Sequence, residues 1–294
     1  MRPRLPADSG WSSGEHSRIA LLNTSKTFPG RVHLLWEYRH LIGQLARRDV
    51  LARYKKSVLG FVWSLLHPFL MMVVLAVVFS YVGRFNTGIK HYPAFILCGY
   101  LPWLFTATSL STSVRSIVDA SNLLHKVAFP REVLPLAVVG ANLFNFVLAL
   151  IPLFIYISVI GVRFSSMLLL LPAAILIQTL LLIGFSFILS AAHVTIRDVG
   201  VILEVVLLAW FYLCPVFYPP SLVLDQAPAW FSNFYFLNPM ATLMVVYRVA
   251  LLNAATPNLD MRIYGLITVS ITVIVLAVGW RFFLWRQRSF VEEL

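Results

Sequence analysis

The sequence predicts an all-α, polytopic membrane protein with six transmembrane helices and an N-terminal amphipathic helix. Of the 294 residues, 60% are hydrophobic and 12% are charged, and the mean hydropathy is +0.83, whereas soluble domains carry about 25% charged residues. Several apolar runs reach the length of about 20 residues that a helix needs to cross the hydrocarbon core. These runs are apolar on both faces, unlike the alternating strands of a β-barrel.

The expected spans follow one another from the first long apolar run to the C-terminus. They are residues 61–82, 92–113, 133–161, 167–193, 201–218 and 264–285. The first run begins near residue 58 and is too long for the core of a signal peptide, so we expect the N-terminal segment to stay attached. Cys98 and Cys214 are expected as buried apolar side chains, and Gln178 as a hydrogen-bonding residue between helices.

The distribution of Lys and Arg predicts the orientation of these spans. If both termini are cytoplasmic, 18 of the 23 cationic residues lie on the cytoplasmic side. The other five are Arg84, Lys90, Arg163, Arg248 and Arg262. Cationic loops are retained in the cytoplasm, so both termini are expected there. The net charge of +11 is then expected to reflect topology and contact with anionic lipids, and no motif indicates nucleic-acid binding.

The N-terminal region divides into a tail and a helix before the spans. Residues 1–30 are rich in Pro, Ser and Gly and are expected to form a flexible cytoplasmic tail. Residues 31–57 are expected to form an amphipathic helix on the membrane surface, with an apolar face of Leu34, Tyr38, Leu41, Ile42 and Leu45. Its basic face would rest on anionic headgroups and anchor the first span, and residues 58–294 would form the six-span transmembrane domain.

Two loops are too long or too apolar to be simple connections. Residues 114–136 are too polar for the membrane, and a short helix within them would have an apolar side that packs on the membrane surface or on another protein. That side would be formed by Ile117, Val118, Leu123, Leu124 and Val127. On the outer side, residues 240–252 are too short to span and are expected at the membrane interface or re-entering partway. Asn238-Pro239 is expected to start that helix.

Aromatic residues gather in the second and fifth expected spans. Tyr100 and Trp103 share one helix face, and the fifth span has two pairs spaced by seven residues: Trp210 with Phe217, and Phe211 with Tyr218. They are expected either to face lipid as an interfacial belt or to line a path along which sugar rings slide.

Motifs of catalysis are missing from the sequence. It has no phosphate-binding loop, no dinucleotide-binding turn and no metal-binding motif. We therefore expect no cofactor in this chain and no enzymatic activity of its own. Glu204 is expected as a solvated residue at the cytoplasmic boundary rather than as a proton-carrying site.

Five segments in the same order resemble a known family. They are RYKKSVLGFVWSLLHP at 53–68, FPREVLP at 129–135, RDVG at 197–200, CPVFYP at 214–219 and LNPMATLMVVYR at 237–248. Together they resemble the membrane (permease) subunit of ABC-2 type exporters for cell-surface polysaccharides, which include the O-antigen and wall teichoic acid exporters. The resemblance covers the chain from about residue 34 to its end.

This resemblance implies an assembly and a substrate. Two copies of the subunit would form the channel in the bacterial inner membrane. Two copies of a separate ATPase, which binds ATP and magnesium, would dock beneath it. The substrate would be a lipid-linked glycan, commonly on undecaprenyl diphosphate. Residues 219–255 would form external helices that gate the exit.

The resemblance also assigns two sets of residues. Residues 115–130 would be the coupling helix on the ATPase, with contacts from Arg115, Asp119, Asn122, Leu123, Lys126, Phe129 and Arg131. The entrance for the lipid diphosphate would be lined by Arg47, Arg48, Arg53, Lys55 and Lys56. Guanidinium groups bind phosphate through two parallel hydrogen bonds, although anchoring of the first span explains the same five cations.

Two other functions remain open on the sequence. An exporter of a drug or small lipid in the same superfamily would share the topology but would tend to lack the basic entrance and the FPRE loop. A membrane-embedded glycosyl or acyl transferase would need a carboxylate or His cluster at one membrane face, and the sequence shows none.

Overall fold

The computed structural model describes residues 28–54, 62–78, 89, 91–124, 129–226, 228–254 and 260–293. Within these residues every regular element is a helix, so the predicted all-α class is confirmed. In the described part of the chain, four helical segments are long and apolar enough to cross a membrane. They are α5 (Tyr92–Ser113), α7 (Val133–Val159), α8 (Leu170–Thr195) with the preceding 3-10 helix η3 (Ser166–Leu169), and α13 (Met261–Arg286).

The first and fifth expected spans contain shorter helices. The helix α4 (Trp63–Val77) occupies the middle of the first span, whose residues 79–82 lie outside the described residues. The helix α9 (Val199–Tyr212) ends before the expected position 218. Pro215 explains this early end, because a proline disfavours helical geometry at the residue before it. Residues 213–218 form turns instead.

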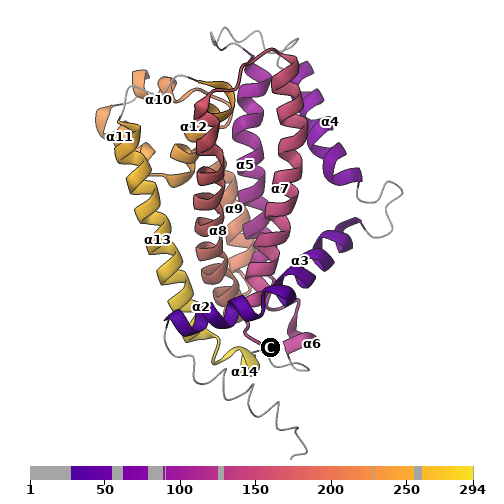
Figure 1. The fold of residues 1–294 in the computed structure, drawn as a ribbon. Helices are drawn as coiled ribbons and strands as arrows, with labels where there is room; N and C mark the ends of the chain where they lie inside the picture. The colour runs from indigo at the N-terminus through magenta and orange to yellow at the C-terminus, as the bar shows by residue number, and fades with distance from the viewer. Residues whose placement is uncertain are drawn as a thin grey trace, which may run out of the picture.

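The long helices stand side by side as an upright bundle (Figure 1). The helices α2 (Phe28–Glu37) and α3 (Arg39–Tyr54) run across one end of this bundle. The short helices α6 (Ser121–Leu124) and α14 (Phe290–Glu293) and the C-terminus lie at the same end. The opposite end carries α10 (Pro220–Gln226) and α11 (Ala229–Phe236). We refer to these as the α3 end and the α11 end.

A close contact between two glycines brings α8 and α13 together. A Cβ atom at Gly184 would lie 2.8 Å from the backbone nitrogen of Leu276, and a Cβ at Gly279 would meet the backbone of Gly184. Small residues allow helix backbones to approach closely in membranes, where packing rather than the hydrophobic effect drives association. The two glycines therefore set the spacing of this helix pair.

Among the described residues, the two largest of three apolar clusters join the long helices. The larger one joins α5, α7, α8 and α12 (Pro239–Leu252), and includes Phe105 stacked on Phe146 with ring centroids 5.1 Å apart. The second lies at the α3 end, where Leu45 packs with Ile117, Phe187 and Phe283. The whole predicted apolar face of residues 34–45 is buried or half-buried, and most of it packs on this second cluster. The amphipathic face therefore contacts the bundle.

Candidate functional site

The candidate site lies at the α3 end, where basic residues, the segment between α5 and α7, and the C-terminus meet. Arg47 and Arg48 are exposed on α3. Arg48 donates from Nε and Nη2 to Oδ1 of Asp49, at 3.1 and 2.9 Å. The side chain of Arg53, and Lys55 and Lys56 entirely, lie outside the described residues. The described part of the expected entrance thus holds two guanidinium groups. That of Arg47 is unpaired, and the charge of Arg48 is neutralised by Asp49.

The segment expected to couple to the ATPase is folded against the bundle. Residues 114–120 form consecutive turns, and the only α-helix among the described residues of this loop is the four-residue α6. Ile117 has no exposed surface, and Val114 and Ala120 are also buried. Among the described residues, the helix expected at 115–130 is therefore limited to α6, and part of its expected apolar side packs on the protein's own core. Arg115, Asp119 and Asn122 are exposed and Leu123 is half-buried, while Lys126 lies outside the described residues.

Phe129 and Arg131, two further residues of the expected coupling set, contact the protein itself. Phe129 is buried in the cluster at the α3 end. Arg131 donates from Nη1 to the backbone oxygen of Gln287, and its guanidinium lies 5.8 Å from the ring centroid of Phe290. Burial lowers the pKa of Arg131, an effect that Glu132 partly offsets. These two residues therefore hold the start of α7 against the C-terminal region.

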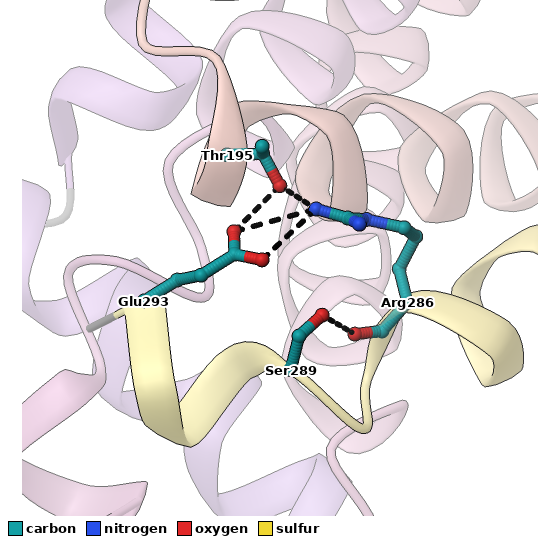
Figure 2. A network of polar contacts seen from close by, with 4 residues as sticks. All are labelled: Thr195, Arg286, Ser289 and Glu293. Carbon is teal, nitrogen blue, oxygen red and sulfur yellow. Dashed lines mark hydrogen bonds and ion pairs between the residues drawn. The ribbon is translucent and has the colours of Figure 1, made fainter.

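Two ion pairs at this end were not found from the sequence. Arg31 of α2 donates from Nη1 to Oε1 of Glu132 at 2.6 Å, and the Glu132 side chain is only 2% exposed. Arg286 of α13 contacts Glu293 of α14 at 3.1 Å. Figure 2 shows that Thr195, at the end of α8, lies between them, since its hydroxyl accepts from Arg286 and donates to Glu293. In the sequence, the only indication of the pair between Arg31 and Glu132 was that Glu132 is a single acidic residue next to Arg131 at a predicted membrane boundary.

Two cavities open beside the end of α5. The first, of about 230 Å³, lies between α3, α5 and α7, and its lining includes Arg48, Asp49 and Asp119. The second, of about 350 Å³, lies between α5, the segment after it and α9, and its lining includes Arg115, Asp119 and Glu204. Thr112 and Asp119 line both cavities. Charged groups from three segments, namely α3, the segment after α5 and α9, are thus brought to one place.

Four of the six expected path aromatics form one cluster toward the α11 end of the bundle. Trp103 lies 5.9 Å from Trp210 and 5.5 Å from Phe211, and Phe211 lies 5.3 Å from Phe217, all between ring centroids. Trp103 is only 6% exposed, so most of its surface is covered within this subunit. The other two are half-buried: Tyr100 packs on the larger apolar cluster, as these four do, without a ring contact to them, and the hydroxyl of Tyr218 lies 3.0 Å from that of Tyr235.

The outer helix α12 is inserted into the bundle. Asn238 caps it as predicted, accepting from the backbone nitrogen of Met240 at 3.1 Å and from Nε1 of Trp210 at 3.0 Å. Tyr247 donates to Oε1 of Gln178 at 2.7 Å, and Gln178 donates to the oxygen of Pro102 at 2.7 Å. Gln178 therefore connects helices as expected, joining α5, α8 and α12.

Arg248 is a buried cation that the sequence placed in an outer loop. Only 2% of the residue is exposed. Its Nε donates to the oxygen of Phe95 at 3.2 Å and its Nη2 to that of Val216 at 2.8 Å. The guanidinium also stacks 3.6 Å from the ring centroid of Phe95. This one side chain ties α12 to α5 and to the turn after α9.

Comparisons with known proteins identify the family to which this chain is similar. Residues 40–252 match the family described as ABC-2 type transporter. The chain is 36% identical over 267 residues to the O-antigen export system permease protein RfbA of Myxococcus xanthus, covering 90% of this chain and 98% of that protein. It is 27% identical over 239 residues to an RfbA of Klebsiella pneumoniae, covering 81% and 90%. A shorter match, 25% over 87 residues, joins 30% of this chain to 33% of the capsule polysaccharide export inner-membrane protein CtrC of Neisseria meningitidis.

Proposed function

The chain belongs to the ABC-2 type transporter family as the membrane subunit of a polysaccharide exporter, and from this premise we propose that it exports a lipid-linked glycan. The glycan would be of the O-antigen or teichoic acid type, carried on undecaprenyl diphosphate, and would leave through the inner membrane. The observation that carries the proposal is the junction at the α3 end. There the basic helix α3, the segment after α5 and two polar cavities lie against one another.

The working channel is a dimer of this subunit. Side chains of the larger cluster fill the interior of the bundle, so a glycan needs a path between subunits. The helix α9 offers a surface for a second copy, because Val201, Val205, Leu208 and Tyr212 form one stripe along it and are 60 to 67% exposed. Apolar stripes of this kind face either lipid or a protein partner in membranes.

A separate ATPase subunit, which binds ATP and magnesium, supplies the energy. We place its contact on the segment between α5 and α7, where Asn122 is exposed and Leu123 is half-buried. Since this segment packs on α3 and on the C-terminal region, a movement imposed by the ATPase would reach the entrance directly. The α3 end is then the cytoplasmic end, and both termini are cytoplasmic.

The diphosphate of the lipid carrier is recognised by the cations on α3. Arg47 is exposed at this end, where its forked donors can meet phosphate oxygens without first breaking an ion pair. The expected partners Arg53, Lys55 and Lys56 follow in the sequence. A lipid phosphate held here stays at headgroup depth while its glycan enters the protein.

The test is ATP hydrolysis by the chain purified with its ATPase and reconstituted in lipid. Addition of a glycan on undecaprenyl diphosphate should raise the hydrolysis rate, whereas small amphiphilic drugs should not. A response to drugs or short lipids without a response to the lipid-linked glycan would assign the chain to the alternative, an exporter of small molecules. A complex reconstituted with a hydrolysis-deficient ATPase provides the background rate.

A further inference from the structure

The two cavities at the α3 end form one polar site around the end of α5. Asp119 and Thr112 line both, so the cavities lie on two sides of the same pair of side chains. Their volumes are about 230 and 350 Å³, and pockets for small molecules in proteins occupy about 300–1,000 Å³. The combined space therefore suits a ligand of the size of one or two sugar rings.

The charges around this site differ from those of a phosphate-binding site. Two guanidinium groups and three carboxylates line the two cavities: Arg48, Arg115, Asp49, Asp119 and Glu204. Arg48 is already paired with Asp49 at 2.9 Å. In the part of the chain that the structure describes, the side chains of Arg115, Asp119 and Glu204 have neither a hydrogen bond nor an ion pair. The available groups are thus two carboxylates and one guanidinium.

This set of groups suits a neutral, hydroxyl-rich ligand. A phosphate with one to two negative charges would face two carboxylates and a single free guanidinium, and like charges repel. Sugar hydroxyls, in contrast, donate to carboxylate oxygens and accept from guanidinium groups. The hydroxyl-bearing Ser111, Thr112 and Ser116 also line the cavities, and apolar residues, mainly of α7, form the rest of the lining.

We propose that the joined cavities bind a neutral sugar ring of the glycan, next to the lipid diphosphate, which stays outside them at the exposed cations of α3. This inference rests on the proposed export of a lipid-linked glycan. It divides the substrate between two adjacent sites, a basic one on α3 for the phosphate and an acidic one around Asp119 for the sugar. It also reassigns Arg115 and Asp119 from ATPase contact to substrate binding, and leaves Asn122 and Leu123 to the ATPase.

The experiment compares two lipids on the reconstituted complex of the full chain with its ATPase. One is a polyprenyl diphosphate carrying a single neutral N-acetylhexosamine, and the other is the same polyprenyl diphosphate without sugar. The measured quantity is the lipid concentration that gives half-maximal stimulation of ATP hydrolysis. The double variant Asp119→Asn/Glu204→Gln keeps side-chain size but removes both carboxylate charges. It should raise this concentration about tenfold or more for the sugar-bearing lipid, because charge-assisted hydrogen bonds are lost, and leave it unchanged for the sugarless lipid.

A matched control and a partial variant accompany it. Asp198 is an exposed carboxylate at the start of α9 that lies outside both cavities, so Asp198→Asn should behave as the wild type toward both lipids. Glu204→Gln alone alters only the second cavity and should give part of the shift. Melting temperatures of the purified complexes verify that each variant is folded.

Each contrary result has a separate meaning. An unchanged half-maximal concentration for the sugar-bearing lipid would overturn the inference alone. A stronger response of the double variant to the sugarless lipid would show that the cavities hold phosphate. Reduced co-purification with the ATPase would show that these side chains face that subunit, and would equally overturn the inference. A wild-type complex that responds to neither lipid would overturn the proposed function, and the inference with it.

Discussion

At the scale of single residues, Arg248 is held by groups that another cation cannot satisfy. Its planar guanidinium binds the carbonyls of Phe95 and Val216 and stacks on the Phe95 ring at the same time. An ammonium group is a compact donor that does not stack in this way, so Lys is not equivalent to Arg at such a site. A Met side chain would leave the buried carbonyl of Val216 without its donor, at about 1–3 kcal/mol, and would lose the second hydrogen bond to Phe95 and the stacking on its ring.

We therefore expect both Arg248→Met and Arg248→Lys to lower the stability of the purified protein, by about 2 kcal/mol or more. Thermal unfolding in detergent measures this. The control is Arg262→Lys, since Arg262 is an exposed cation at the start of α13 and its replacement should leave the melting temperature unchanged. A melting temperature of Arg248→Lys equal to that of the wild type would show that the charge alone is sufficient.

The ion pair of Arg31 and Glu132 gives a second prediction. The Glu132 side chain is 2% exposed and that of Arg31 is 20% exposed, so Arg31→Gln leaves a buried carboxylate without this partner. Loss of one partner of a buried pair costs about 3–5 kcal/mol, and partial exposure of Arg31 lowers our expectation to about 2–3 kcal/mol. The exchange Arg31→Glu/Glu132→Arg should recover part of the loss. No recovery in thermal unfolding would indicate that Glu132 is stabilised by its own surroundings rather than by Arg31.

The sequence could not show which cations are buried. The charge count treats Arg248 as an outer-loop cation because it uses only position along the chain, and the carbonyls of Phe95 and Val216 come from segments far away in sequence. Phe129 and Arg131 were assigned to a partner protein for the same reason. The identity of an apolar or cationic residue in a loop does not show whether its side chain contacts its own chain or another protein. By comparison, Asn238 could be assigned correctly because a cap acts within its own helix.

At the scale of elements, the contact of α8 with α13 depends on Gly184. A Cβ there would lie 2.8 Å from the backbone of Leu276, and backbone atoms cannot move aside as a flexible side chain can. Gly184→Ala should therefore force the helices apart and cost about 1–3 kcal/mol, despite the helix propensity that alanine adds. The control is Gly265→Ala on α13, where a Cβ would meet nothing within 4 Å and the substitution should be neutral or stabilising. Equal melting temperatures for both variants would mean that the pair is not tightly packed.

The short helix α14 should detach at low pH. A hydrogen bond from Thr195, with help from the charge of Arg286, holds the pKa of Glu293 below its ordinary value of 4.5 (Figure 2). A depressed carboxyl pKa means that the contact stabilises the folded chain above pH 4.5 and that this stabilisation is lost as the pH falls through the lowered pKa.

Hydrogen exchange of the last residues measures this detachment. After correction for the intrinsic rate, protection of α14 should be constant above about pH 5 and should fall as the pH drops through the lowered pKa of Glu293. Glu293→Gln should show the reduced protection already at neutral pH. Protection in that variant that matches the wild type at every pH would mean that Phe290, packed on Phe283, holds α14 without the ion pair.

Element boundaries were predicted well where the signal is local. The helix α5 has the expected limits of 92 and 113, because Pro93 favours a helix start and polar residues follow its last apolar turn. The segment after α5 was predicted less well, since the burial of Ile117 depends on α3, α8 and α13, which the sequence does not bring together. The end of α9 was also misplaced, although Pro215 could have indicated it.

At the scale of the whole molecule, the two ends of the bundle differ in the groups that they carry. The α3 end holds the cations of α3, both cavities and the segment proposed for the ATPase, while the α11 end holds the buried polar contacts that fix α12. The four elements that cap the long helices at the α3 end, α2, α3, α6 and α14, share one apolar cluster or contact it. A displacement of any of them would therefore move the wall of the first cavity, which includes Leu45, Ala120 and Leu134 of this cluster.

The last prediction concerns the orientation of these ends. Asn122, next to Leu123 in α6, and Ser221 in α10 are both exposed and lie at opposite ends of the bundle (Figure 1). The uneven distribution of Lys and Arg predicts that α6 is cytoplasmic and α10 is external. In cells that produce this subunit without its ATPase, a membrane-impermeant thiol reagent should therefore label Ser221→Cys before permeabilisation and Asn122→Cys only after it. The native Cys98 and Cys214 are both buried, so the wild-type protein gives a low background. Labelling of Asn122→Cys but not Ser221→Cys in intact cells would reverse the orientation, and would place the basic face of α3 on the side of the membrane that has neither ATP nor newly made glycan.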